Sequence, residues 1–182
     1  HPHGQIYAMP FIAPTVQREI ESARQHSLGN SGECLFCRLL AEEIRQKSRI
    51  VSSDDHFTAF VPFAARFPAE VTLYARRHAR TLLDLNNAER ASLAENISIL
   101  RRKYDSLYGF VLPLMMAVKQ APLREPELPY HFHVQFLPLQ RSATKLKYLA
   151  SLETGFGSFL ADTAPEAMAE SLRNCDPQTS GR

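Results

Sequence analysis

The stretch Tyr130-His131-Phe132-His133-Val134-Gln135-Phe136 alternates polar and apolar side chains along its whole length. Successive side chains of a β-strand point to opposite faces of the sheet. A strand here would therefore place His131, His133 and Gln135 on one face and aromatic or aliphatic residues on the other. The stretch predicts a strand that has one face on a hydrophobic core and an imidazole-rich second face.

The rest of the chain predicts further helices and strands around this one. The clearest helix runs between Asn86 and Tyr108, where Asn86 and Glu89 form an Asn-x-x-Glu variant of the capping box. Gly109 ends it, and its apolar residues fall on one stripe, namely Leu93, Ile97, Leu100, Tyr104 and Leu107.

The other elements are expected from shorter patterns. Helices are predicted over 14–27 and 35–46 (the latter with apolar residues Leu35, Leu39 and Ile44), from Lys145 and after Pro165. Extended runs are predicted over 5–9, 57–63 and 70–75, and a buried strand over 111–118. Strands in series with embedded helices predict an α+β fold with a mainly antiparallel sheet and two or more packed helices.

Composition restricts the classes of function. The 182 residues suffice for one domain with a sizeable core, and a net charge of only +2 gives no electrostatic case for a nucleic-acid partner. No apolar run reaches the roughly 18 residues that a membrane-spanning helix needs. Three cysteines and no secretory signal pattern favour a cytoplasmic, reducing compartment, where a cysteine pair more often binds metal than forms a disulfide.

The segment His1-Pro2-His3-Gly4-Gln5 repeats the His-x-His-x-Gln pattern of residues 131–135. Pro2 favours an extended geometry, which would put both imidazoles and Gln5 on one face. A neutral imidazole is a good nucleophile near pH 7, because its unperturbed pKa is about 6.5. The alternative is a chance or vector-derived His-Pro-His. Repetition after about 130 residues predicts two related units in a longer ancestral chain.

A second pattern predicts a metal site. Cys34 and Cys37 form a Cys-x2-Cys pair at the start of a predicted helix, and His78 and His131 follow. Two thiolates at this spacing, with two imidazoles brought in by folding, suit tetrahedral Zn²⁺. The alternative is a pair of buried cysteines that behave as small hydrophobic residues.

The sequence resembles the C-terminal half of the galactose-1-phosphate uridylyltransferase family, which belongs to the histidine triad superfamily. The resemblance covers nearly the whole chain and is carried by residues 1–8, Arg141-Ser142-Ala143-Thr144, the Lys147-Tyr148 pair and Glu153.

This resemblance implies a histidine-triad-like domain over residues 29–174. Residues 1–28 would be the last strand of a first histidine-triad repeat with a helical connection, and residues 175–182 a flexible tail. The missing N-terminal half would come from a separate chain or from the second subunit of a homodimer.

The resemblance also implies an activity. In that family the second histidine of the pentad attacks the α-phosphorus of UDP-glucose, and galactose-1-phosphate then takes the uridylyl group. The nucleophile would be His3, with Gln5 donating a hydrogen bond to the phosphoryl oxygen. Lys147, Tyr148 and Glu153 match positions that contact the substrate's phosphate or sugar.

The resemblance offers two metal sites that compete for one histidine. Related histidine-triad domains bind zinc through the positions of Cys34, Cys37, His78 and His131. The uridylyltransferases have another site in their second half, with one Glu and three His, sometimes occupied by iron. Glu19, His131 and His133 match three of these ligands, but Lys119 lies near the fourth position, and an ammonium group is not a ligand. The zinc set is therefore preferred.

Two other functions stay open. A stand-alone histidine-triad nucleotide hydrolase or phosphorylase would use His133, although the third triad position is Gln135. A non-catalytic zinc-binding remnant would explain Lys119 and also Phe159, which lies near a sugar-holding Gln of the family. An intact His3 favours retained transfer chemistry.

Overall fold

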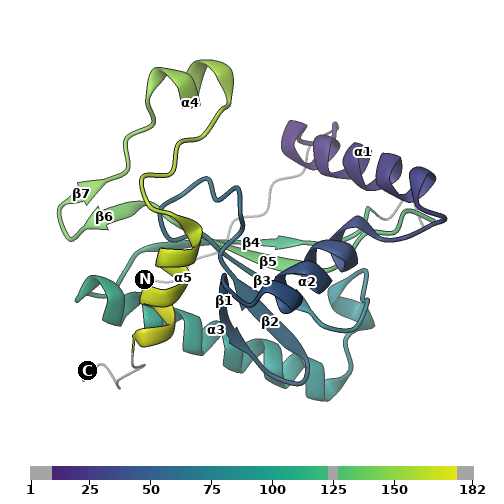
Figure 1. Cartoon of the computed structure of the whole chain (residues 1–182), viewed down its shortest axis with the longest axis horizontal. Coiled ribbons are helices and arrows are strands. Elements are labelled where there is room, and N and C mark those ends of the chain that lie inside the picture. Colours follow the sequence, from purple (N-terminus) through teal and green to yellow (C-terminus); the bar gives the residue numbers. More distant parts are fainter. Residues whose placement is uncertain (1–9, 123–126, 176–182) are drawn as a thin grey trace.

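A five-stranded antiparallel sheet forms the centre of the computed structural model, which describes residues 10–122 and 127–175 (Figure 1). The strand order is β1-β2-β3-β5-β4. The strands are β1 Ile50–Ser53, β2 Phe57–Phe60, β3 Val71–Ala75, β4 Leu114–Lys119 and β5 His133–Pro138. Together with the helices this sheet confirms the predicted α+β class.

Helices α1 Pro14–Gly29 and α2 Leu35–Gln46 lie on one face of this sheet, and α3 Asn87–Tyr108 and α5 Pro165–Asn174 lie on the other (Figure 1). A further helix, α4 Ser151–Phe156, lies away from the sheet, and a short 3-10 helix spans Leu82–Asp84. A two-stranded hairpin, β6 Gln140–Ser142 and β7 Lys145–Leu146, leads into α4, and this part of the chain projects from the body. Within the described ranges, no helix combines the length and the apolar character needed to cross a bilayer.

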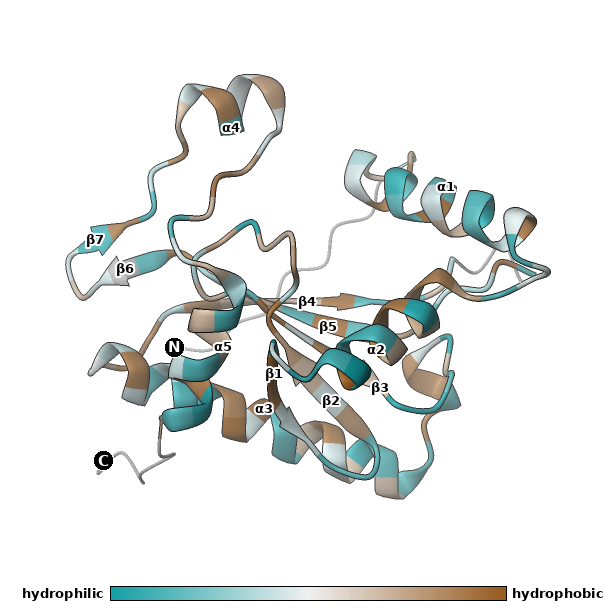
Figure 2. Cartoon of the chain, viewed as in Figure 1, coloured by the Kyte–Doolittle hydropathy of each residue, from teal (hydrophilic) through white to brown (hydrophobic). Residues whose placement is uncertain are grey.

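Two hydrophobic clusters form on opposite faces of the sheet because neighbouring strand residues point in opposite directions. Leu73 and Phe136 belong to the cluster under α3 and α5, whereas Tyr74 belongs to the cluster under α1 and α2. Figure 2 shows α3 with hydrophilic and hydrophobic residues interspersed, as expected of a helix with one face on a core.

The ends of α3 follow from local sequence as predicted. The Asn86 side chain accepts a hydrogen bond from Glu89 N at 2.9 Å, and Glu89 Oε2 accepts one from Asn86 N at 2.8 Å. Gly109 ends the helix with φ 73°, a left-handed conformation that glycine adopts without steric cost. The predicted apolar stripe faces the core: Leu93, Leu100 and Tyr104 are buried, and Ile97 and Leu107 pack against them.

One predicted strand differs from the structure, and one strand of the structure is missing from the prediction. The run over 111–118 is not a buried strand: β4 begins at Leu114, after Pro113, and Met115, Met116 and Val118 are each almost half exposed. The cause is that β4 lies at the sheet edge and pairs with β5 alone among the described strands. The short strand β1 was not predicted.

Two helical predictions also need correction. No helix starts at Lys145, because Lys145–Leu146 is a strand that pairs with β6. The backbone N–H of Lys147 donates to Leu139 O at 2.7 Å and continues this pairing. The helix α4 begins only at Ser151. The bounds of α2 match the prediction, but its buried face carries Phe36 and Leu40 rather than Leu39. The predicted strand over 5–9 and most of the predicted tail, 176–182, lie outside the described residues.

The cap of α3 gives a test of the fold. Replacing Asn86 by Ala should lower the free energy of unfolding by about 1 kcal/mol, because the N–H of Glu89 loses its acceptor. Urea unfolding followed by circular dichroism measures the change. The control is Asn87→Ala, because Asn87 is the first residue of α3 and is exposed. This substitution should change the free energy of unfolding by less than about 0.5 kcal/mol. Equal effects of the two substitutions would contradict the assigned cap.

Candidate functional site

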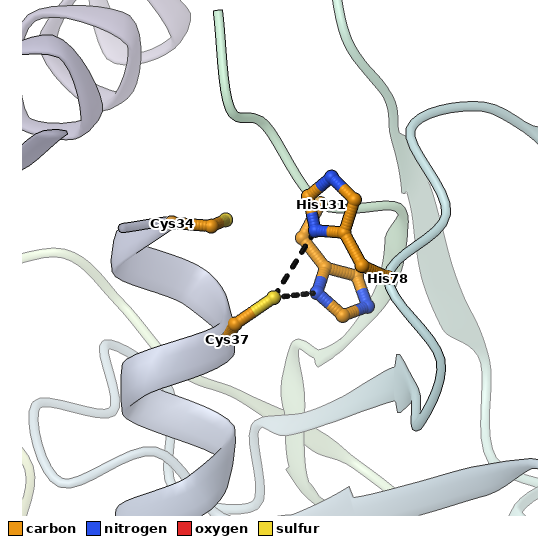
Figure 3. A group of neighbouring side chains, drawn as sticks. All are labelled: Cys34, Cys37, His78 and His131. Atoms are coloured by element: carbon orange, nitrogen blue, oxygen red, sulfur yellow. Dashed lines mark hydrogen bonds between the residues drawn. The ribbon is translucent and has the colours of Figure 1, made fainter. Parts of the chain in front are cut away.

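The structure brings Cys34, Cys37, His78 and His131 together at one end of the sheet (Figure 3). Cys34 is the N-cap residue of α2, and Cys37 lies in the first turn of that helix. His78 follows β3, and His131 precedes β5. One potential ligand atom from each residue lies within 4.8 Å of all the others.

Local backbone contacts explain why residues so distant in sequence meet here. Phe132 N donates to Ala79 O at 2.7 Å, and Ala121 N donates to Arg80 O at 2.9 Å. The first bond holds the segment after β3 against the residues that precede β5, and the second holds it against the residues that follow β4. The rings of His78 and His131 have centroids 5.3 Å apart. The N-terminus of α2, whose dipole favours negative charge, carries the two thiols to this point.

The hydrogen bonds of His131 fix its tautomer. Its ring is fully buried, and Nε2 donates to Ala75 O at 2.7 Å. Burial lowers the pKa of His131 to about 4, so the ring is neutral at pH 7. A neutral ring with its proton on Nε2 has its lone pair on Nδ1, and that atom lies 3.2 Å from Cys37 Sγ. The arrangement is typical of a metal-ligating histidine oriented by a backbone carbonyl.

The two thiols titrate as a pair. The hydrogen bond from Cys37 lowers the pKa of Cys34 to about 6. The same hydrogen bond, together with burial, raises the pKa of Cys37. A single thiolate is therefore favoured without a cation, whereas a divalent cation beside both sulfurs would stabilise the second negative charge.

The donor set fits a closed zinc site. Tetrahedral Zn²⁺ with S and N ligands places its ligand atoms roughly 3.4–3.8 Å from one another. Cys37 Sγ lies 3.1 Å from His78 Nδ1 and 3.2 Å from His131 Nδ1, as the dashed lines in Figure 3 mark, and all four atoms lie within 4.8 Å of one another. Shifts of up to about 1 Å would bring all four ligand atoms to the tetrahedral spacing.

Lys147 and Glu153, predicted to contact substrate, lie in a buried ion pair. The Lys147 ammonium donates to Glu153 Oε1, Arg66 O and Leu160 O, each at 2.8 Å. Its three N–H donors are thus all engaged within the chain. The hydrogen bond from Lys147 lowers the pKa of Glu153 to about 2, so the carboxylate stays ionised. The pair fastens the base of the projecting segment to the body of the domain.

Tyr148 and Phe159, also singled out in the sequence, lie on either side of this pair. Tyr148, the next residue after Lys147, is 84% exposed. The ring of Phe159 packs on Phe67 with a centroid separation of 5.8 Å and lies 6.0 Å from Lys147 Nζ. Only Tyr148 of the three predicted substrate contacts points outward. His3 and Gln5 lie outside the described residues.

The polar face of β5 continues beyond the cysteine and histidine cluster. The buried ring of His133 donates from Nδ1 to His131 O at 2.9 Å, and burial lowers its pKa to about 4. Gln135 accepts a hydrogen bond from Arg66 at 3.3 Å, and both line a cavity of about 460 Å³ on this face. The sequence predicted the position of Gln135, but nothing in its local pattern pointed to Arg66.

The structure does not place Glu19, His131 and His133 around one metal position. Lys119 Nζ lies 2.9 Å from Glu19 Oε1, and His131 turns its Nδ1 to Cys37. The described residues thus bring the cysteine-containing set together and leave Glu19 with Lys119.

Comparison with known proteins gives matches along the whole chain. The family described as "Galactose-1-phosphate uridyl transferase, C-terminal domain" matches residues 19–180. A galactose-1-phosphate uridylyltransferase of Thermotoga maritima is 39% identical over 178 residues, which are 97% of this chain and 55% of that protein. The chain therefore spans about half the length of the curated relatives it matches.

Solved structures agree with these sequence matches. A uridylyltransferase structure superposes with a TM-score of 0.88 at 35% identity, covering 100% of this chain and 56% of that one. A zinc-bound histidine triad family protein from Mycobacterium smegmatis, 18% identical, has a TM-score of 0.54 over 79% of this chain and 92% of its own. The fold is therefore histidine-triad-like, as expected.

The buried Lys147–Glu153 pair gives a test of the projecting segment. Lys147→Met should lower Tm by about 2–6 °C, because the Glu153 carboxylate loses its counter-ion. Calorimetry measures this, and limited proteolysis should show faster cleavage within 140–160. Lys145→Met, at an exposed position of the same hairpin, is the matched control. Indistinguishable behaviour of the two variants would contradict the anchoring role.

Proposed function

Because this chain belongs to the galactose-1-phosphate uridyl transferase family, we propose that it is the C-terminal half of a nucleotidyltransferase. The reaction is the exchange of UMP between UDP-glucose and galactose-1-phosphate. The observation that carries the proposal is the family match over residues 19–180, joined to 39% identity over 97% of the chain. The domain boundaries expected from the sequence, 1–28 and 29–174, remain part of the proposal.

The transfer proceeds by two displacements at the α-phosphorus. An imidazole nitrogen of His3 attacks, a P–N bond forms, and the P–O bond to the leaving glucose-1-phosphate breaks. A phosphate oxygen of galactose-1-phosphate then attacks the uridylyl-histidine, and the P–N bond breaks to release UDP-galactose. Two similar displacements replace one difficult step, and Gln5 stabilises the charge that develops on the phosphoryl oxygen.

The rest of the enzyme docks at the β4 edge of the sheet. Within the described ranges β4 has a partner strand on one side only, and its Met115, Met116 and Val118 side chains are about half exposed. An apolar edge strand of six residues is a ready template for pairing with another chain. The occupant is the N-terminal half, supplied as a separate chain or by a second subunit.

The zinc ion is held by Cys34, Cys37, His78 and His131. Four protein ligands leave no open position, which is typical of a structural rather than a catalytic zinc. The site would join the start of α2, the segment after β3 and the start of β5. Zinc binding needs reduced thiols, and the cytoplasm is the compartment that keeps thiols reduced, so the protein is expected there.

The projecting segment presents Tyr148 to the substrate or to the second half. Lys147 and Glu153 act here by positioning, since their charged atoms are engaged with each other and with Arg66 O and Leu160 O. Tyr148 is the exposed side chain that their anchoring holds in place.

The transfer reaction is tested by labelling the protein. UDP-glucose with a radiolabelled α-phosphate should leave acid-labile, base-stable label on this chain when the N-terminal half is present. A phosphoramidate bond has that stability, and the label should leave on addition of galactose-1-phosphate.

Two substitutions distinguish the enzyme classes. His3→Asn should reduce the label to background, whereas His133→Asn should retain it. Label lost only in His133→Asn would favour a histidine-triad hydrolase that uses His133. No label in any combination of chains, with zinc still bound, would favour the non-catalytic zinc-binding protein.

The zinc site is tested by metal analysis. Cys37→Ser should lose bound zinc and lower Tm, since the binding energy of a structural zinc contributes directly to folding. Cys175→Ser removes the free cysteine outside the cluster and should keep the zinc content of the unmodified chain. Inductively coupled plasma mass spectrometry of the purified chains measures both. Equal zinc content in the two variants would refute the assigned ligands.

A further inference from the structure

Glu19 of α1 is held by Lys119 at the end of β4 and by Tyr130, which precedes β5. The Lys119 ammonium donates to both carboxylate oxygens, at 2.9 and 3.2 Å, and the Tyr130 hydroxyl donates to Glu19 Oε2 at 2.9 Å. The side chains of Lys119 and Glu19 are only 13% and 21% exposed. Lys119 pairs with His133 across β4 and β5, so the imidazole belongs to the same cluster.

Without Lys119, this cluster would resemble a metal site. Glu19 offers a carboxylate. The His133 ring donates from Nδ1 to His131 O at 2.9 Å, which leaves Nε2 as the nitrogen that could bind a metal. Carboxylate and imidazole are ordinary ligands of divalent transition metals. The site of one Glu and three His that the family resemblance implies would need further imidazoles beside Glu19 and His133.

The residues present do not fit such a metal. Both nitrogens of His131 are engaged elsewhere, Nε2 with Ala75 O and Nδ1 with Cys37 Sγ. Lys119 offers an ammonium group, which has three donors and no lone pair. Two ligands, Glu19 and His133, remain, and a cation already lies against the carboxylate of Glu19.

We propose that the Lys119 ammonium is the resident cation of this second cluster and that it clamps α1 to the sheet where a metal ion would otherwise be needed. A partly buried carboxylate requires a counter-charge, and the ammonium supplies it together with two hydrogen bonds. The clamp is needed because α1 is largely polar and buries only Ile20 and Ala23. Among the described residues, the cluster of Cys34, Cys37, His78 and His131 then remains the candidate metal site, and Glu19 needs no metal ion.

The proposal is tested by exchanging the cation. Lys119→His should create a third ligand beside Glu19 and His133, and the purified chain should then bind about one additional equivalent of Zn²⁺ or Fe²⁺ over the unmodified chain. The double variant Glu19→Gln/Lys119→His should lose this gain. The proposal is overturned if the unmodified chain binds a second equivalent that Glu19→Gln removes, or if Lys119→His gains no metal while folding normally.

A thermodynamic cycle covers the case in which the histidine variant fails to fold. Lys119→Met and Glu19→Gln should each lower Tm by about 2–6 °C. The double variant Glu19→Gln/Lys119→Met should lower Tm by less than the sum of the two single effects, because the two charges stabilise each other. Additive losses would overturn the clamp. Neither the metal content nor the Tm depends on uridylyl transfer. Both results can therefore be interpreted even if the transfer reaction is not found.

Discussion

The position of β5 at the centre of the sheet is the constraint on which the other features depend. It pairs with β3 on one edge and β4 on the other, so its backbone groups are satisfied along its length. Phe132, Val134 and Phe136 are at most 1% exposed, and burial of each such side chain contributes roughly 1.5–3 kcal/mol. Because those residues fix the register, the alternate residues His133 and Gln135 must face the other side.

The cysteine and histidine cluster follows from that register. His131 lies two residues before β5, and the bond from Phe132 N to Ala79 O brings the segment with His78 beside it. The N-terminal end of α2 lies beside these histidines and supplies the thiols of Cys34 and Cys37. The site is thus a junction of three segments, each of which is held by its own backbone contacts.

The molecule uses different cations to fasten its peripheral elements. A lysine ammonium buried at the base of the projecting segment is held by Glu153 and two carbonyl oxygens. Another ammonium, from Lys119, holds α1 through Glu19. The thiols and imidazoles, in contrast, have the softer donor set that suits zinc.

Elements whose signals are local can be predicted from the amino-acid sequence alone. Asn86, Glu89 and Gly109 mark the ends of α3, because caps satisfy backbone groups within a few residues of them. The bounds of α2 and the alternation of residues 130–136 were predictable for the same reason. The Cys-x2-Cys pair is also a local pattern, whereas its meeting with His78 and His131 depends on the fold. Only the tertiary structure decided the rest: that β4 is a half-exposed edge, that residues 145–146 form a strand, that Lys147 is buried against Glu153, and that Lys119 meets Glu19. These features depend on contacts between residues that are far apart in the chain. The free energy of such contacts exceeds the local conformational preference of each segment, and the contacts produce no periodic pattern in the sequence.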